Sequence, residues 1–490
     1  MFVALYTSRV LLDTLGAEDF GLYHVVAGFV VLAGFLQGSL SGTTQRFVAY
    51  ELGKGNNNNL RNVFSMSINI HVLFALVILV VGGTLGTLYL PSLLTFEEGR
   101  STAVIVVFWF ALLSFMVNIA VVPCHAMIIA HEEMKVFAWV SVADGLLKLG
   151  IVFLIQYLLY DPLIAYGVLV FLTTLLIGLV YVAYVYTKYK HERYSIVWDK
   201  SLFKQLLSFS GWTVWGSAAS VFANQGTNIL LNVFFGPVVN AAKSIGNQAS
   251  GALNNFVTNL QMAINPQIVK SYSANDQAYT NKLINYGSKY NFFLIFTLAL
   301  PILMRTEDVL NIWLVEPPEY TALFLRLILL NVIIESVSRP LITAAQATGN
   351  IKLYQFVVGG ILLLNIPAAF LVLKAGHSPA SVFIVSIGLT VLAGAARVIM
   401  LKRIFSFSFR QFFKDSLLRI ALVSVLGVGF TLIVLTYFPG QLGFIKFLLF
   451  SAICFVSTSI VVWFAGFEGH ERARLVGMLG IKERMLRMFK

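Results

Sequence analysis

The stretch SRVLLDTLGAEDFGLYHVVAGFVVLAGFLQGSLSGTTQRFVAYELGK, residues 8–54, decides the fold class of this chain. It consists of two predominantly apolar segments, and it places Arg9 and Arg46 in or at the ends of them. A helix that crosses a bilayer needs about 20 such residues. A charge at the centre of that helix costs roughly 2.5–3.5 kcal/mol or more, so it usually faces a partner, an aqueous cavity or a ligand. The stretch therefore predicts membrane helices that carry buried cations.

Composition extends this prediction to the whole chain. Of its 490 residues, 58% are hydrophobic and 11% are charged, and the mean hydropathy is +0.83. Soluble domains are roughly 45–50% apolar and about 25% charged. The two cysteines, Cys124 and Cys454, lie inside apolar segments, which excludes a disulfide framework. The chain is therefore predicted to be an all-α, polytopic membrane protein.

Apolar runs predict about fourteen transmembrane helices. They lie at approximately 1–14, 20–45, 63–90, 102–129, 136–160, 162–187, 206–235, 241–269, 287–313, 321–347, 352–374, 379–402, 415–438 and 442–466. The first run is shorter than a spanning helix requires. We therefore expect the first helix to be truncated, with its true start upstream of Met1.

The net charge of +12 has a distribution that argues against a nucleic-acid partner. Basic residues fall in short tracts between the apolar runs, as in 188–204, and they alternate with short acidic turns such as Glu18-Asp19 and 316–319. Because Lys and Arg concentrate in cytoplasmic loops, the basic side is predicted to be cytoplasmic. The C-terminus lies on that side.

Three pairs of short segments predict an internal duplication. Ser8–Asp13 matches Thr227–Asn232, Gln45–Tyr50 matches Gln267–Tyr272, and Pro123–Lys135 aligns without gaps on Pro340–Lys352. The pairs occur in the same order at similar offsets. Six helices in each copy give both copies the same orientation, so a pseudo-twofold axis along the membrane normal is expected.

The predicted organisation follows from this duplication. An N-lobe covers 1–190, a C-lobe covers 205–405, and two further helices occupy 413–466. In such parallel repeats the substrate binds between the halves, which rock against each other. The tail, 467–490, alternates cations with Leu, Met and Phe, which favours an amphipathic helix on anionic lipid. A solvated helical tail is the alternative.

Arg9 is the strongest candidate for substrate contact. It has no acidic residue three positions away. Asp13 at i+4 could pair with it but could equally well face the opposite lobe. A guanidinium donates to phosphate oxygens in a bidentate way. We therefore expect Arg9 to face a central cavity and bind an anionic group there.

Other intramembrane charges have equally good structural explanations. Arg46 and Arg397 lie near the predicted cytoplasmic surface, where they either meet phosphate or snorkel to headgroups. The pairs Asp144–Lys148 and Glu335–Arg339 have i,i+4 spacing, which favours a local ion pair.

The eighth predicted span is unusually polar. Asn247, Gln248, Asn254, Asn255 and Asn259 fit a stripe that faces an aqueous cavity holding a sugar headgroup. Hydrogen bonding between helices is the alternative. Together the predicted cavity contacts are Arg9, Arg46, Asn224, Asn228, Asn247, Gln248, Asn255 and Arg339.

Enzymatic functions lack the motifs they need. The chain has no G-x-x-x-x-G-K-[ST] phosphate loop, and the sequence from His131 to Met134 lacks the second histidine of a zinc protease helix. Its histidines are scattered, and its connections are too short for a soluble catalytic domain. We therefore predict no catalytic residue, no metal site and no cofactor.

One set of motifs resembles a known family. The string R-V-L-L-D-x-L-G-x-x-D-F-G-L-Y at 9–23, followed by Q-R-F at 45–47 and G-K at 53–54, resembles the polysaccharide flippases of the multidrug/oligosaccharidyl-lipid/polysaccharide superfamily. The resemblance implies two six-helix lobes plus two extra helices in the bacterial inner membrane. It also implies export of undecaprenyl-pyrophosphate-linked oligosaccharide for O-antigen, capsule or exopolysaccharide, beside membrane lipids and the polysaccharide polymerase machinery. By position it places Arg9 and Arg46 at the cavity, with coupling to an H⁺ or Na⁺ gradient or to the membrane potential.

Two other transport functions stay open at this point. A multidrug/cation antiporter of the same fold would prefer acidic groups in its first and seventh spans and about twelve spans. This chain offers mainly Asp13 there. A flippase for the lipid-linked peptidoglycan precursor is closer, and the sequence does not separate it from the polysaccharide flippase.

Overall fold

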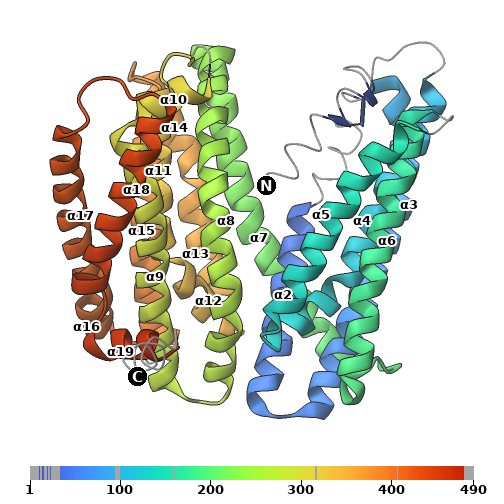
Figure 1. Ribbon diagram of the computed structural model, residues 1–490. Helices are drawn as coiled ribbons and strands as arrows, with labels where there is room; N and C mark the ends of the chain where they lie inside the picture. Colours follow the sequence, from blue (N-terminus) through green and yellow to red (C-terminus); the bar gives the residue numbers. More distant parts are fainter. Residues whose placement is uncertain are drawn as a thin grey trace, which may run out of the picture. The chain divides into compact units, whose positions relative to one another are not determined.

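The computed structural model describes two compact helical units, residues 1–218 and 219–490. The described residues are Val10, Leu11, Thr14, Leu15, Asp19, Leu22, Tyr23, 34–93, 100–157, 161–314, 317–404 and 407–478. Helices make up nearly all of these residues, and no strand occurs among them (Figure 1). The predicted all-α fold is confirmed.

The first unit is built from long helices that pack mainly on α4. Its helices are α2 (Gly34–Lys54), α3 (Asn57–Leu93), α4 (Ser101–Ala130), α5 (Met134–Ile155), α6 (Pro162–Lys188), the short η1 (Lys190–Glu192) and the first half of α7 (Lys200–Phe235). Buried Val104, Val107, Phe108 and Leu112 form the centre of its core. The start of α6 is fixed by Asp161, whose carboxylate accepts the N–H groups of Leu163 and Ile164, as an N-cap does.

The second unit contains the rest of α7 and all later helices. They are α8 (Pro237–Ser273), α9 (Gln277–Met304), α10 (Thr306–Trp313), α11 (Thr321–Ser336), α12 (Arg339–Ala347), α13 (Lys352–Leu363), α14 (Asn365–Lys374), α15 (Ser381–Ile404), α16 (Phe409–Phe412), η2 (Phe413–Leu417), α17 (Leu418–Thr436), α18 (Phe444–Val461), η3 (Val462–Gly466) and α19 (Gly469–Met478). Its largest core joins α8, α9, α11, α17 and α18 through residues such as Phe292, Phe296, Leu329 and Val423. Figure 1 shows α17 and α18 beside α9.

Proline and glycine set three boundaries in this unit. Gly236, with φ +82°, is the single residue between α7 and α8, and Pro237 is the first residue of α8. This is the expected use of a left-handed glycine after one helix and a proline at the first turn of the next. Pro340 and Pro367 lack the N–H that an uninterrupted helix needs, and breaks precede them between α11 and α12 and at Leu364 between α13 and α14.

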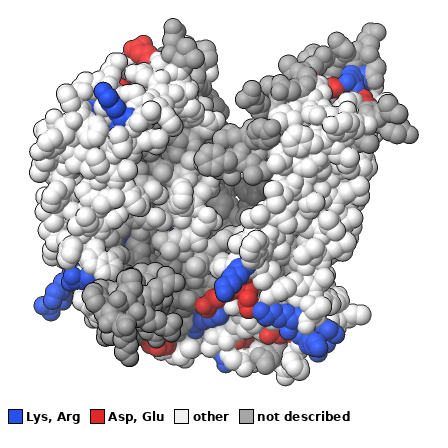
Figure 2. All heavy atoms as spheres, viewed as in Figure 1, with Lys and Arg blue, Asp and Glu red and all other residues white. Residues whose placement is uncertain are grey.

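Ten helices of the described part are long and apolar enough to cross a membrane. They overlap ten of the fourteen predicted spans, although the helix predicted at 287–313 lies at Gln277–Met304 and 306–313 forms the separate α10. The predicted span 1–14 lies largely outside the described residues, and of the predicted span 20–45 the structure describes Leu22, Tyr23 and 34–45, the last as the start of α2. The predicted spans 206–235 and 241–269 are helical, as α7 and α8. Both helices are too polar to be counted among these ten. Figure 2 shows charged side chains toward the two ends of each unit and uncharged surface between them.

Candidate functional site

The exposed face of α8 carries a polar stripe at helical spacing. Asn247, Gln248, Asn255 and Asn259 are all exposed, and so are Ser244 one turn before them and Gly251 and Thr258 between them. We call these seven residues the amide stripe. The opposite face, with Ala242, Leu253 and Val257, is buried against α9 and α11. The stripe runs from Ser244 to Asn259, fifteen residues apart, which is about 22 Å of helix at 1.5 Å per residue.

Amide side chains suit the hydroxyl groups of a sugar. Each Asn or Gln offers two N–H donors and one acceptor oxygen, so it matches hydroxyls that both donate and accept. In hydrocarbon, unsatisfied amides are costly, and polar side chains therefore face water or other polar groups. The amide stripe contains three of the predicted cavity contacts, Asn247, Gln248 and Asn255.

A second feature, the polar pocket, lies inside the second unit. Its volume is about 120 Å³. It is lined by Ser220, Ala223, Asn224, Asn331, Glu335, Leu362, Asn365, Ser386, Leu389, Thr390 and Arg397, from α7, α11, α13, α14 and α15. The Asn365 amide donates to the Ser386 hydroxyl at 2.8 Å. Arg397 is only 5% exposed.

The chemistry of the polar pocket is mixed. Within the described part of the chain, the buried side-chain oxygens of Asn331 and Asn365 and the Nε of Arg397 have no hydrogen-bond partner. Amide oxygens and the Glu335 carboxylate are the kind of oxygen ligand that binds hard cations. The Arg397 guanidinium in the same pocket favours an anion. Among the described residues no group of three or more His, Cys, Asp or Glu side chains is arranged to hold a metal ion.

Arg339 contacts both α8 and a residue of the polar pocket. Its guanidinium donates to the Asn254 side-chain oxygen on α8 at 3.3 Å. It also lies 3.9 Å from Glu335, the carboxylate of the polar pocket. The i,i+4 pair predicted from the sequence therefore forms at the outer limit of an ion pair, with an additional link to α8.

Arg46 is buried in an aromatic cage of the first unit. Its guanidinium carbon lies 4.5 Å from the Phe47 ring centroid, 4.8 Å from Tyr50 and 5.3 Å from Phe209. The residue is 8% exposed. Cation–π contacts of this kind stabilise a desolvated cation. Arg9, the strongest candidate from the sequence, lies outside the described residues.

Asn224 and Asn228 lie on α7 close to one another along the chain. Asn224 lines the polar pocket. Asn228 donates its amide to the side-chain oxygen of Gln225 at 2.9 Å. The two predicted contacts therefore have different surroundings, and of the two only Asn224 is among the residues that line the polar pocket.

The sequence reasoning missed a buried lysine beside these residues. Lys243 on α8 is 4% exposed, and its ammonium donates to the main-chain carbonyl of Asn224 at 3.3 Å. Its sequence neighbourhood, K-S-I-G-N-Q at 243–248, is the start of the polar eighth span. A lysine within a polar membrane helix is a signal that could have been used.

The first unit holds a separate pocket, the His125 pocket, that the sequence did not reveal. It has a volume of about 220 Å³ between α4, α5 and α6, and Asn118, His125, Asp144 and Lys148 help to line it. The predicted Asp144–Lys148 pair is confirmed at 2.8 Å. Within the described part of the chain, His125 Nε2 is buried without a hydrogen-bond partner. The pair therefore lines a pocket and is more than a surface contact.

Comparison with known structures shows what the fold resembles. An outward-facing multidrug resistance MATE family transporter of the MOP superfamily superposes with a TM-score of 0.71 at 11% identity, over 82% of this chain and 91% of that one. A MATE transporter in the bent conformation gives 0.72, with the same identity and coverage. A MOP superfamily transporter from Pyrococcus furiosus, described as having a binding pocket of reverse polarity, gives 0.69 at 12% identity over 82% and 91%. At these identities the likeness shows the fold alone.

Sequence comparison shows the family. No curated protein matches the chain. The family model described as "Polysaccharide biosynthesis protein" matches residues 2–272, more than half of the chain. With its MATE-like fold and its helices of membrane-spanning length, this chain belongs to the polysaccharide biosynthesis protein family.

Proposed function

We propose that this chain flips undecaprenyl-pyrophosphate-linked oligosaccharide repeat units across the bacterial inner membrane, for O-antigen, capsule or exopolysaccharide. It does so by alternating access of two lobes, with the prenyl chain left in lipid. The proposal includes fourteen transmembrane helices, of which α7 and α8 are two, and a cytoplasmic C-terminus. The single observation that carries it is the amide stripe of α8, an exposed row of sugar-compatible side chains on one face of this helix.

Cationic side chains support the pyrophosphate part of the proposed substrate. A pyrophosphate needs cationic or N–H donors, and Arg is well suited to it. Arg9, Arg46 and Arg339 stay predicted contacts, and Lys243 joins them because it is a buried cation one turn before Asn247. Membrane lipids and the polymerase machinery are the proposed neighbours of the transporter.

An ion gradient of H⁺ or Na⁺ is the proposed energy source. Glu335 is the group that we assign to this coupling, since its carboxylate shares the polar pocket with the unpartnered oxygens of Asn331 and Asn365. Protonation or a bound cation would change the charge balance between Glu335 and Arg397. Glu335→Gln should then leave substrate binding intact while it abolishes the dependence of transport on the gradient.

A flippase-null strain tests the amide stripe. The double variant Asn247→Leu/Asn255→Leu removes sugar-compatible groups without adding bulk or charge, and we expect surface polysaccharide to fall to the level of the null strain. Asn58→Leu is the matched control, because it makes the same change at an exposed position at the start of α3. Membrane levels of all variants are compared by immunoblot. Full complementation by the double variant would overturn the assignment of the stripe.

Arg9→Ala is the second test in the same strain. We expect loss of complementation with the protein still present in the membrane. Transport in proteoliposomes separates the rival functions, because a multidrug antiporter would move a cationic dye. A peptidoglycan-precursor flippase would move that lipid-linked precursor in place of the oligosaccharide repeat unit.

A further inference from the structure

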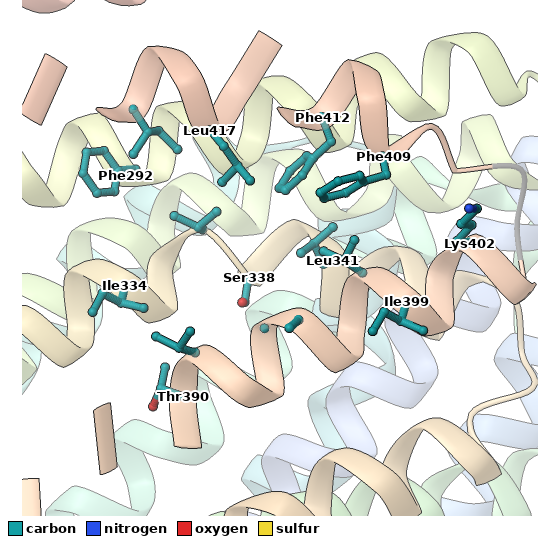
Figure 3. Close-up of a pocket in the computed structure, with 16 residues that line it drawn as sticks. Phe292, Ile334, Ser338, Leu341, Thr390, Ile399, Lys402, Phe409, Phe412 and Leu417 are labelled. Carbon is teal, nitrogen blue, oxygen red and sulfur yellow. The ribbon is translucent and has the colours of Figure 1, made fainter. Parts of the chain in front are cut away.

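The second unit contains an apolar groove separate from the polar pocket. Its volume is about 650 Å³, within the roughly 300–1,000 Å³ typical of ligand pockets. It is formed by α15 on one side and by α16, η2 and α17 on the other, with α9, α11 and α12 at its floor (Figure 3). Its lining is Phe292, Ile334, Val337, Ser338, Leu341, Thr390, Val391, Gly394, Ala395, Val398, Ile399, Lys402, Phe409, Phe412, Leu417 and Ile420.

The floor of the apolar groove is buried and its rim is exposed. Phe292, Leu341 and Phe412 are buried. On the rim, Val391, Ala395 and Ile399 follow one another at i,i+4 spacing along α15 and are all exposed. Gly394 and Ala395 are the smallest of the α15 residues in the lining. An apolar groove on a membrane helix is therefore open to hydrocarbon from the bilayer.

One end of the apolar groove is cationic. Lys402 stands there beside Phe409 and Ile399, while Thr390 and Ile334 stand toward the other end (Figure 3). Lys402 is exposed and makes no ion pair with a carboxylate in the described ranges. Basic pockets between membrane helices on the cytoplasmic side bind anionic lipid headgroups.

The length of the apolar groove fits one lipid chain. Thr390 and Lys402 are twelve residues apart on α15, which is about 18 Å of helix. The hydrocarbon core is about 30 Å thick, so one leaflet is about 15 Å deep. An acyl chain of one leaflet therefore runs the length of the groove with its phosphate at Lys402. An undecaprenyl chain is much longer than this groove.

We propose that the apolar groove binds an anionic phospholipid of the bilayer, with one acyl chain along α15 and the phosphate paired with Lys402. In the proposed orientation this lipid belongs to the cytoplasmic leaflet. The site does not depend on which substrate the transporter moves.

Native mass spectrometry of the full chain in detergent tests this site. We expect the wild type to retain one added phosphatidylglycerol and to prefer it about fivefold over phosphatidylcholine, as one lysine near anionic lipid contributes about 1 kcal/mol. Lys402→Gln should remove the preference. Ala395→Phe, which fills the groove, should remove the retained lipid whatever its headgroup.

Two matched controls lie on the same helix and outside the lining. Arg403→Gln makes the equivalent loss of charge, and Leu392→Phe enlarges another exposed apolar side chain; both should bind lipid like the wild type. Equal retention by wild type and Ala395→Phe would overturn the site, as would equal affinity for the two headgroups. Displacement of phosphatidylglycerol by an equal concentration of undecaprenyl phosphate would also overturn the proposal, since the groove would then belong to the carrier lipid.

Discussion

At the scale of single residues, Arg100 holds together three segments of the first unit. Its guanidinium forms ion pairs with Asp19 and with Asp161. Asp19 is 7% exposed and belongs to the D-F-G-L-Y motif that carries the family resemblance. Asp161 caps the start of α6. The aspartate of the motif therefore has a structural partner at the start of α4.

Arg100→Ala should destabilise the protein by about 1.5–3 kcal/mol, the usual contribution of hydrogen bonds to charged groups. The physical reason is that the buried Asp19 carboxylate loses a cationic partner. Thermal unfolding of the purified protein in detergent measures the effect. Arg403→Ala, at an exposed arginine of α15, is the control and should leave the unfolding temperature unchanged. An unchanged temperature for Arg100→Ala would show that the ion pairs contribute nothing.

These residues also show where prediction from the sequence ended. Asp144–Lys148 could be predicted because i,i+4 spacing alone puts both side chains on one helix face. Arg100 pairs with residues 81 and 61 positions away, so only the folded unit reveals it. Lys243 could have been suspected from its place in the polar eighth span, but its contact with the Asn224 carbonyl on α7 is visible only in the fold.

At the scale of elements, α19 is locked to α9 by a buried ion pair. The Lys289 ammonium donates to Glu471 at 2.8 Å, and both side chains are at most 2% exposed. The Tyr290 hydroxyl and the Glu468 N–H also donate to this carboxylate, at 2.8 and 2.6 Å. Burial opposes ionisation of Glu471, but the hydrogen bonds from Glu468 and Lys289 outweigh it and hold its pKa below the ordinary value.

This pair predicts an acid-sensitive contribution to stability. Since the folded-state pKa of Glu471 is lowered, its contribution is present above the unfolded pKa of about 4.3 and is lost as the pH falls through the folded value. Glu471→Gln should therefore lower the unfolding temperature at pH 7, and the difference from wild type should shrink below pH 4. A difference that is the same at both pH values would contradict this account.

The partner of Glu471 provides the second half of the experiment. Removing one member of a buried pair costs about 3–5 kcal/mol, whereas an apolar replacement of both is often near neutral. Lys289→Met alone should therefore be strongly destabilising, and Lys289→Met/Glu471→Leu should recover most of the loss. The sequence predicted an amphipathic tail over 467–490, and it could not predict this lock, because Glu471 finds its partners only after α9 and α18 have packed.

Helix positions were easier to predict than these contacts. Hydrophobic runs longer than a globular helix needs are read directly from the sequence, and ten of them became candidate spans. The more polar α7 and α8 were also expected as helices, because apolar runs cover 206–235 and 241–269. The breaks before Pro340 and Pro367 follow from the missing N–H. The predicted lobes, 1–190 and 205–405, stay predictions.

At the scale of the whole molecule, the asymmetry of Lys and Arg predicts which face lies inside the cell. The connection between α8 and α9 lies between Lys270 and Lys282, whereas the connection after α14 carries few basic residues. Ala274 and Ser378 are exposed in these two connections. Three candidate spans separate them, α9, α11–α12 and α13–α14, so they must lie on opposite sides.

Cysteine labelling decides the orientation. Since Lys and Arg stay cytoplasmic, Ser378→Cys should react with a membrane-impermeant maleimide in intact spheroplasts, and Ala274→Cys only after permeabilisation. Cys124 and Cys454 are buried and unpaired, so the native background should be low. The reverse pattern would place Lys402 and the end of α15 outside. It would also move the proposed phospholipid to the outer leaflet, so this single measurement fixes which face of the protein is cytoplasmic and which leaflet supplies the lipid.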